Sequence, residues 1–520
     1  MDQHYLLDSL QLTTPGGQGA PQYPPVEQVV PQFLQLFAGV GAPQAGSKVK
    51  AGMVRDLLVI LEAVDCQWLL GDWQRNSTPV LRDLVVALST YAMLPQHEPD
   101  GGELSCKDSS NAAAASRAAE VILVFQSILT KVEAAKGLEE LGFKAVGSCL
   151  QAVAGPMYVF AVTHAAEKPW SRPRTRTLAQ ELLEGLLRVC DCQIVPEFLR
   201  GATEDEEGWF AMVMQCLKPE LTKETWQRSP ATKHVFSWTL QQVTRPWLGP
   251  HLEKVLPPSL LLSDDYRVEN KILGVQCLHH IIHNVPGADL CQFNRAQVVH
   301  HALSNHLYTK EAQLMQAVLP CLLDLLVILE RAPGQPSHKP RSAKPSDKVL
   351  QLVLTHMEPE HQLALRRVYA QNLPAFIERL SIQISRHLKR LLRVIVGYLE
   401  VYDGPEETAR LAMLETLKRT IQHAWPRMTS RLTVLLQALL RLMWDAATDR
   451  SLTPEPVTAA LLQGATDCLL LLDRCSHGQV KILLQGVQRS CQDDRLKEYL
   501  RKVEEEPVGS FIPTEPKRDF

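Results

Sequence analysis

Histidine is the residue type with the greatest chemical potential in this sequence, because six histidines gather in one short stretch. They are His279, His280, His283, His300, His301 and His306. His279 and His283 are four residues apart, so on a helix both rings would project from one face, as they do in helical zinc sites. No paired CxxC and no HExxH motif lies nearby to complete a coordination shell. We therefore expect a polar helix face beside a helix–helix interface and no bound metal.

The other reactive residue types also lack the spacing that catalysis requires. His356 and His361 are five residues apart with Pro359 between them, so their rings do not share a helix face. Cys190 and Cys192 are too close for the CxxC spacing of redox or zinc sites. The sequence contains no glycine-rich phosphate loop, GxSxG elbow or kinase signature. We expect no catalytic residue, no cofactor and no enzymatic activity.

Four basic residues form the clearest candidate for partner binding. They occur at positions i, i+3, i+4 and i+7 of one segment and are Arg386, Lys389, Arg390 and Arg393. This spacing places them on one helix face, which would suit an acidic partner segment or a polyphosphate. The alternative is a solvated face whose long apolar stems cover the core. Trp238 and Trp247 are further candidates, since Trp is common at binding hot spots, although a repeat corner also needs large side chains.

The element around which these residues must be organised runs from Asp264 to Pro286 and reads as one buried helix. Asp264 or Asp265 is expected to cap its start by accepting free backbone N–H groups. Gly274 costs about 1 kcal/mol relative to Ala in a helix, which predicts the close approach of a neighbouring helix. The apolar residues recur at three- and four-residue steps and are predicted to be core: Val268, Ile272, Val275, Leu278 and Ile282.

Composition excludes several classes of protein. The formal net charge of −3 over 520 residues gives the chain no polyanion-binding balance, so we expect no nucleic-acid partner. Twelve cysteines are scattered without a repeating spacing, which is typical of reduced, buried thiols in an intracellular protein. The N-terminus lacks the bases and apolar core of a signal peptide, and no run of about 18 uncharged apolar residues occurs. We expect a protein of the cytoplasm and nucleus that does not bind membranes.

The chain order predicts an all-α solenoid of the HEAT/armadillo type. An aromatic helix stopped by Pro-Trp occurs twice, at Trp170 and Trp247, which are 77 positions apart. This separation is close to two repeats of about 40 residues. No segment shows strand periodicity. We expect a disordered N-terminus at 1–25, N-terminal helical repeats at 26–229 with a flexible loop at 95–111, central HEAT-like repeats at 230–330, a disordered basic loop at 331–346, C-terminal HEAT-like repeats at 347–505 and a flexible tail at 506–520.

Several stretches resemble a known family. They are KHVFSWTLQQVTRPWL (233–248), DDYRVENKILGVQCLHHIIHNVP (264–286), NRAQVVHHALSNHLYT (294–309), THMEPEHQLALRRVYAQNLPAF (355–376), GYLEVYDGPEE (397–407) and ATDCLLLLDRCSHG (465–478). They resemble the Tel-two-interacting protein two family, in particular its vertebrate members, over about residues 112–500. The stretches are helix-packing segments, so they identify a family without locating a binding site.

The resemblance implies a non-enzymatic scaffold subunit of the Triple T (TTT) co-chaperone complex. It implies binding to the large subunit, Tel-two-interacting protein one, and to Tel two. It further implies work with the ninety-kilodalton heat-shock chaperone and its RuvB-like ATPase co-chaperone. The clients would be phosphatidylinositol-3-kinase-related kinases: mTOR, ATM, ATR, DNA-PKcs, SMG-one and TRRAP.

The sequence leaves two alternative functions open. The first is a karyopherin-like or other HEAT-repeat adaptor for transport or assembly in another pathway, which would bind a GTPase according to its nucleotide state. The second is a metal-dependent hydrolase built on the histidine cluster, which would contain stoichiometric zinc.

Overall fold

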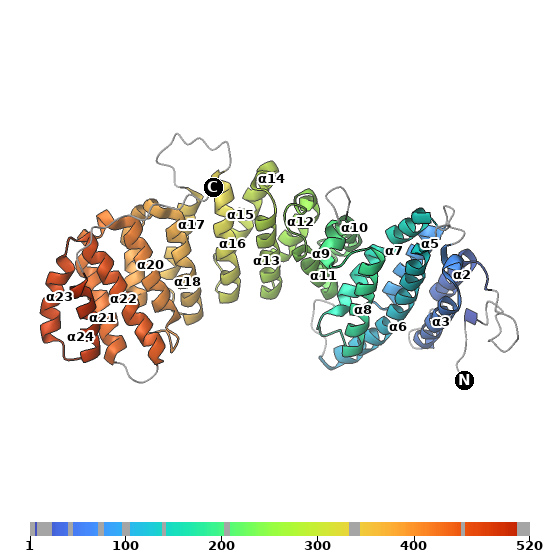
Figure 1. Ribbon diagram of the computed structural model, residues 1–520, viewed down its shortest axis with the longest axis horizontal. Helices are drawn as coiled ribbons and strands as arrows, with labels where there is room; N and C mark the ends of the chain where they lie inside the picture. Colours follow the sequence, from blue (N-terminus) through green and yellow to red (C-terminus); the bar gives the residue numbers. More distant parts are fainter. Residues whose placement is uncertain are drawn as a thin grey trace. The chain divides into compact units, whose positions relative to one another are not determined.

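The computed structural model describes residues 6–7, 23–39, 45–70, 77–95, 104–137, 142–201, 208–331, 344–448 and 453–506. Across these ranges the regular structure consists of α-helices and short 3-10 helices, without a strand. The all-α prediction is therefore confirmed. The chain divides into two compact units, Met1–Pro258 and Ser259–Phe520 (Figure 1). This boundary falls inside the range 230–330, which we predicted from the sequence to be one set of central HEAT-like repeats.

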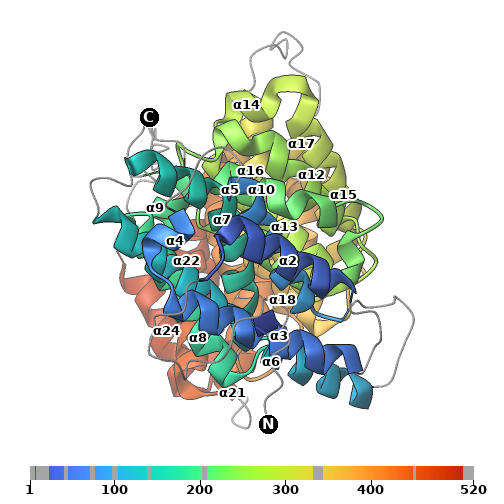
Figure 2. The same ribbon diagram turned by 90° about the vertical axis from the view of Figure 1, so that its right-hand side faces the viewer.

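The N-terminal unit is built from helices that stack in two rows. One row runs α2–α5–α7 and the other α3–α6–α8, with α7 and α8 packed on each other; Figure 2 shows α3 against α6. The helices of this unit are α2 (Val26–Gly39), α3 (Ala45–Ala63), α4 (Cys66–Leu70), α5 (Ser77–Tyr91), α6 (Leu104–Lys136), α7 (Gly142–Ala165), α8 (Pro173–Val189), α9 (Val195–Arg200), α10 (Phe210–Leu217), α11 (Pro230–Gln241) and α12 (Leu252–Ser263), whose last turn belongs to the second unit.

The expectation of a loop over 95–111 is wrong for its second half. Helix α6 begins at Leu104, because the alanine-rich sequence that follows has the highest helix propensity and extends the helix towards the N-terminus. The other ranges were also expected to be irregular, and most of their residues lie outside the described structure; these ranges are 1–25, 331–346 and 506–520. At their edges, α16 still includes Arg331 and α17 already starts at Pro345.

The C-terminal unit has two layers of helices, which Figure 1 shows in green to red. In the first layer, α13, α16, α18, α20, α22 and α24 each contact the next, and in the second layer α17, α19 and α21 do so. The chain alternates between layers, as in HEAT repeats. The helices are α13 (Val268–Asn284), α14 (Gly287–Cys291), α15 (Arg295–His306), α16 (Ala312–Arg331), α17 (Pro345–Met357), α18 (Leu363–Leu380), α19 (Leu388–Leu399), α20 (Thr408–Ala424), α21 (Leu432–Thr448), α22 (Glu455–Cys475), α23 (Gln479–Ser490) and α24 (Asp494–Glu505).

The organising helix of the sequence is α13, and it starts later than predicted. Its N-cap is Arg267, with no side-chain cap, so the expected cap by Asp264 or Asp265 is wrong. The Asp265 carboxylate instead accepts a hydrogen bond from the buried amide of Asn270. Of the five predicted core residues, three are buried and two are half-buried. The buried ones are Val275, Leu278 and Ile282, and the half-buried ones are Val268 and Ile272 in the first turns.

Three helices are long and apolar enough to cross a membrane when judged only by length and composition. They contain the windows Ser109–Lys136, Ala145–Ala165 and Ala312–Arg331, which belong to α6, α7 and α16. Between 50% and 67% of each window is buried inside the fold. In α16 the leucines pack into the first layer against α13 and α18. The expectation that the protein binds no membrane stays a prediction.

Candidate functional site: an interaction surface on the C-terminal unit

The four predicted basic residues lie in the second layer of the C-terminal unit. Arg386 ends a 3-10 helix at Ser381–Arg386, and the other three belong to α19. Lys389 and Arg393 are exposed, whereas Arg390 is half-buried. The predicted helix face is therefore interrupted at His387, where the 3-10 helix passes into α19.

Two acidic residues at the ends of α17, Asp347 in its first turn and Glu358 directly after its last residue, neutralise part of this basic face. Arg386 Nη1 lies 3.2 Å from an oxygen of Asp347, a side chain that is only 4% exposed. Arg390 donates from Nε and Nη2 to both oxygens of Glu358, at 2.9 and 2.8 Å. These hydrogen bonds lower the pKa of Glu358 and raise that of Arg390. Within the described structure the residues act first as a clamp between α17 and α19.

The remaining positive charge points outwards. Arg393 Nη1 is 3.9 Å from Glu358 and its side chain is 68% exposed. Lys389 is exposed and makes no ion pair with any residue that the structure describes. Sequence spacing identified these residues correctly as neighbours, but it could not show that Asp347 and Glu358, about 30 to 40 positions earlier, would face them.

Further along the same layer, charged and apolar side chains alternate at the surface. Arg441 of α21 pairs with Glu400 at the end of α19, with 3.6 Å between Nη1 and Oε1. Large apolar residues are exposed around this pair, two after α19 and two on α21. They are Val401, Tyr402, Val434 and Trp444. Exposed apolar groups rimmed by charges are typical of a protein-interaction surface.

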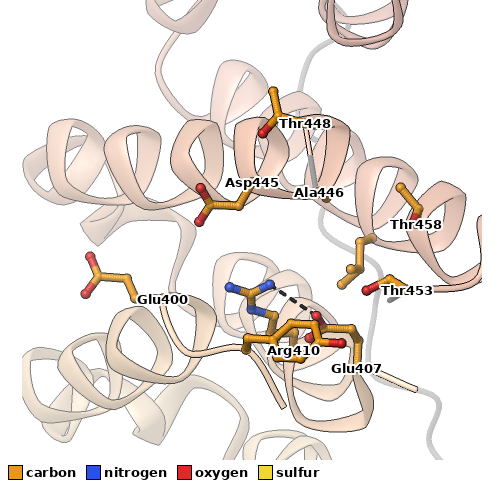
Figure 3. A pocket seen from close by; sticks show the side chains of 10 residues that line it. Glu400, Glu407, Arg410, Asp445, Ala446, Thr448, Thr453 and Thr458 are labelled. Atoms are coloured by element: carbon orange, nitrogen blue, oxygen red, sulfur yellow. Dashed lines mark hydrogen bonds and ion pairs between the residues drawn. The ribbon is translucent and has the colours of Figure 1, made fainter. Parts of the chain in front are cut away.

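A cavity of about 340 Å³ opens beside these residues, among the ends of α19 to α22. Its lining includes Glu400, Tyr402, Arg410, Asp445 and three threonines. In Figure 3 the guanidinium of Arg410 points into the cavity, while Asp445 projects from the α21 side. Among the described lining residues, the carboxyl groups of Glu400, Glu407 and Asp445 outnumber the guanidinium of Arg410, so the cavity suits a basic or hydrogen-bond-donating side chain of a partner.

A buried group of charged side chains forms the floor of this cavity. Glu407 Oε1 lies 3.3 Å from Arg410 Nη1, and both side chains are almost fully buried. Asp403 accepts a hydrogen bond from the Ala409 backbone N–H at 2.7 Å and so fixes the start of α20. Burial, reinforced by Asp403, raises the pKa of Glu407 to about 7. The GYLEVYDGPEE stretch of the sequence therefore builds a corner between α19 and α20.

The site offers binding groups and no catalytic constellation among the described residues. Burial raises the pKa of Cys149 to about 12 and raises that of Cys468 further, so these thiols are not nucleophiles. Among the described residues that line the cavity, none is a cysteine, a serine or a histidine. The arrangement can therefore bind a partner through apolar contact and ion pairs.

The two candidate tryptophans lie in the N-terminal unit. Trp238 on α11 is half-buried, with its ring 6.4 Å from that of Tyr158. Trp247 is also half-buried and has the Arg200 guanidinium 4.6 Å from its ring centroid. Both rings already serve packing inside this unit, which agrees with the role of repeat filler.

The histidine cluster separates into two groups. His306 bonds to Ser263 at 2.8 Å, and burial lowers the pKa values of His306 and His300. His279 and His283 instead converge on Asp324 of α16, 45 and 41 positions further along the chain. Asp324 could not be predicted as a partner from the sequence, because an isolated acid in an apolar helix belongs to no motif.

Comparison with known sequences shows close relatives of nearly full length. The chain is 52% identical to human TELO2-interacting protein 2 over 92% of its own length and 93% of the relative's. It is 49% identical to the rat protein of that name, covering 91% and 92% of the two chains. The mouse protein is 47% identical, with 97% and 98% covered.

Among solved structures, the chain is similar to Kap121p and to importin beta. Kap121p bound to RanGTP matches with a TM-score of 0.44 and 12% identity over 92% of this chain and 45% of that one. Importin beta matches with a TM-score of 0.43 and 12% identity, covering 92% and 66%.

The sequence profile of the Tti2 family matches residues 158–404. These residues run from the middle of α7 in the N-terminal unit to the corner that precedes α20 in the C-terminal unit. Together with the near-complete coverage of the three mammalian proteins, this match shows that the chain belongs to the Tti2 family, the family of TELO2-interacting protein 2.

Proposed function

We propose that this chain is a non-enzymatic scaffold subunit of the TTT co-chaperone complex. The observation that carries the proposal is the identity of about half of all residues, over more than nine-tenths of the chain, with proteins named TELO2-interacting protein 2. Its partners are then Tel two and the large subunit, Tel-two-interacting protein one. Stacked amphipathic helices without a catalytic constellation in the described ranges suit this role.

In this role the chain supports the maturation and stability of phosphatidylinositol-3-kinase-related kinases, including mTOR, ATM, ATR, DNA-PKcs and TRRAP. It does so together with the ninety-kilodalton heat-shock chaperone and the RuvB-like ATPase co-chaperone, in the cytoplasm and nucleus. The free energy of its contacts is used for association, so the protein lowers no chemical barrier itself.

We place the contact with the large subunit on the second layer of the C-terminal unit. Exposed Val434 and Trp444 supply apolar area there, and aromatic residues are enriched at binding hot spots. Lys389 and Arg393 supply the outward charge that remains after α17 has neutralised its neighbours. Such charges increase the association rate and fix register more than they increase affinity.

The structure also determines which variants test this contact cleanly. Replacing all four basic residues by acidic ones would place a second negative charge beside the buried carboxylate of Asp347. A double reversal, Lys389→Glu with Arg393→Glu, changes only exposed side chains. A second variant, Trp444→Ser, removes the exposed aromatic ring. A double reversal on exposed Lys223 and Arg228 of the N-terminal unit is the charge-matched control.

The experiment is association of the full-length chain with the purified large subunit, followed by biolayer interferometry. We expect the double reversal to slow association by about tenfold at low salt, with a smaller effect at high salt because salt screens exposed charges. Trp444→Ser should speed dissociation. Unchanged kinetics in both variants would exclude this surface, and no binding by the wild-type chain would contradict the scaffold role itself.

A further inference from the structure

Three potential ligand atoms meet at one point between α13 and α16. His279 Nε2 lies 2.8 Å from Asp324 Oδ2, and His283 Nε2 lies 3.0 Å from the same oxygen. The two imidazole nitrogens are themselves 3.0 Å apart. The three atoms therefore form a nearly equilateral triangle, contributed by neighbouring helices of the first layer.

Hydrogen bonds alone cannot satisfy this triangle. An imidazole nitrogen carries either a proton or a lone pair, so it either donates or accepts. When Asp324 is an ionised carboxylate, and whatever the tautomers of His279 and His283, at least one of the three short contacts then joins two lone pairs or two N–H groups. A cation above the triangle would accept all three lone pairs at once.

The size of the triangle fits a transition-metal ion. Atoms separated by 2.8, 3.0 and 3.0 Å lie on a circle of radius about 1.7 Å. Zinc bonds to nitrogen and carboxylate oxygen are about 2.0–2.2 Å long, so an ion about 1.1–1.4 Å above the plane of the triangle reaches all three atoms. Two histidines and one carboxylate are also a donor set that suits zinc better than calcium or magnesium, which prefer oxygen ligands.

The surroundings allow an ion to enter. The side chains of His279, Asp324 and His283 are 28%, 40% and 57% exposed, so solvent reaches all three. Their backbones, in contrast, are held by the buried faces of two long helices, where Leu278 and Leu325 are fully buried. Ligand side chains held on rigid helices lose little conformational entropy when they bind an ion, which lowers the free-energy cost of binding.

From this geometry we propose that His279, His283 and Asp324 bind one zinc ion, which joins α13 to α16. The ion would have three protein ligands and a fourth position open to water. The three ligands come from two neighbouring helices, so the ion acts as a structural link between them.

The test uses the untagged full-length chain, stripped with a chelator and then equilibrated with zinc. We expect one zinc per chain by elemental analysis, and cobalt substitution should give the visible absorption of a tetrahedral site. His283→Ala and Asp324→Asn should weaken zinc binding by more than the roughly 10–100-fold caused by losing an outer-shell contact. His280→Ala is the matched control, because this histidine lies on the same helix outside the triangle, and it should bind zinc as the wild type does.

Thermal unfolding separates the role of the ion from its binding. Zinc should raise the Tm of the wild type and of His280→Ala and leave that of Asp324→Asn unchanged, since a ligand that binds only the folded state stabilises it. Circular dichroism checks that each variant keeps its helicity, which we expect because the three side chains are solvent-accessible. Absence of stoichiometric zinc in the wild type, or equal binding by the triangle variants, would overturn the site. Binding without a rise in Tm would overturn the link between helices.

Discussion

The backbone of Ser263 at the end of α12 lies directly against Gly274 in the middle of α13. A Cβ atom built on Gly274 would come within 2.2 Å of the Ser263 nitrogen and 2.6 Å of its Cα. Both obstacles are backbone atoms, so no side chain can rotate away to make room. The close approach expected from a glycine inside a helix therefore occurs at this point, where α13 leaves the preceding helix.

Gly274→Ala should consequently destabilise the protein although alanine favours helices. We expect a loss of about 1–3 kcal/mol in the free energy of unfolding, the usual cost of overpacking, measured by urea denaturation. Gly397→Ala is the matched control, because it also lies inside a helix but a Cβ there meets nothing within 4 Å. The control should be stabilised by about 0.5–1 kcal/mol. Equal effects of the two substitutions would contradict the packing of Gly274.

Arg386 and Lys389 should respond differently to charge reversal, although sequence spacing makes them equivalent. Arg386→Glu removes one of the partners of buried Asp347, which His387 also contacts, and should cost about 1–2 kcal/mol in stability, because a buried carboxylate loses a hydrogen bond. Lys389→Glu should change stability by less than about 0.5 kcal/mol, as exposed substitutions usually do. Thermal unfolding of the two variants in parallel checks this difference, and similar losses would argue against the clamp between α17 and α19.

Acid should destabilise the N-terminal unit through His164. This side chain is 1% exposed, and burial lowers its pKa from 6.5 to about 4. Between these pH values the unfolded chain binds a proton that the folded chain does not, so stability falls as pH decreases from 6.5 towards 4. The loss from this one group should reach about 2 kcal/mol at pH 5.

His164→Leu should reduce this loss of stability at acid pH. The free energy of unfolding would be measured by urea denaturation at several pH values between 7 and 4.5. Leucine keeps an apolar side chain of similar size beside Phe160, whose ring is 4.9 Å from that of His164. His361→Leu serves as the control. The His361 ring is exposed to water, so the substitution should leave the pH dependence of the unfolding free energy unchanged. If His164→Leu lost as much stability at acid pH as the wild type does, other groups would be responsible for the acid sensitivity.

Glu407 should produce the opposite pH dependence in the C-terminal unit. Its pKa is raised from 4.5 to about 7, so between these values the folded chain holds a proton that the unfolded chain has lost. Its contribution to stability is present below pH 4.5 and is lost as pH rises to 7. Glu407→Gln imitates the protonated acid and should therefore gain stability relative to the wild type as pH rises, by up to about 3 kcal/mol at pH 8.

Glu406→Gln is the control for this effect. Glu406 is the adjacent residue but its side chain is 65% exposed, so its substitution should not change the slope of stability against pH. Differential scanning calorimetry at several pH values would give both curves. A constant difference between wild type and Glu407→Gln across this range would mean that Glu407 ionises in the folded state as it does in the unfolded state.

Local pattern was sufficient to predict the helices and much of their buried faces. The three- and four-residue steps of α13 place Val275, Leu278 and Ile282 in the core, because the helical period depends only on backbone geometry. The start of the helix was not predictable in this way. Either Asp264 or Asp265 satisfies the rule for a cap, but tertiary contacts hold Asp265 against Asn270 and the helix begins at Val268.

The sequence by itself determined the all-helical fold, the family and the type of residue available for binding, since these depend on periodicity and on local stretches. Only the tertiary structure decided which of those residues are free to act. It placed Glu358 against Arg390, which converts part of a basic face into a clamp. It also brought Asp324 to His279 across 45 positions. Such pairings depend on how one helix pair stacks on the next, and no spacing within a single helix encodes them.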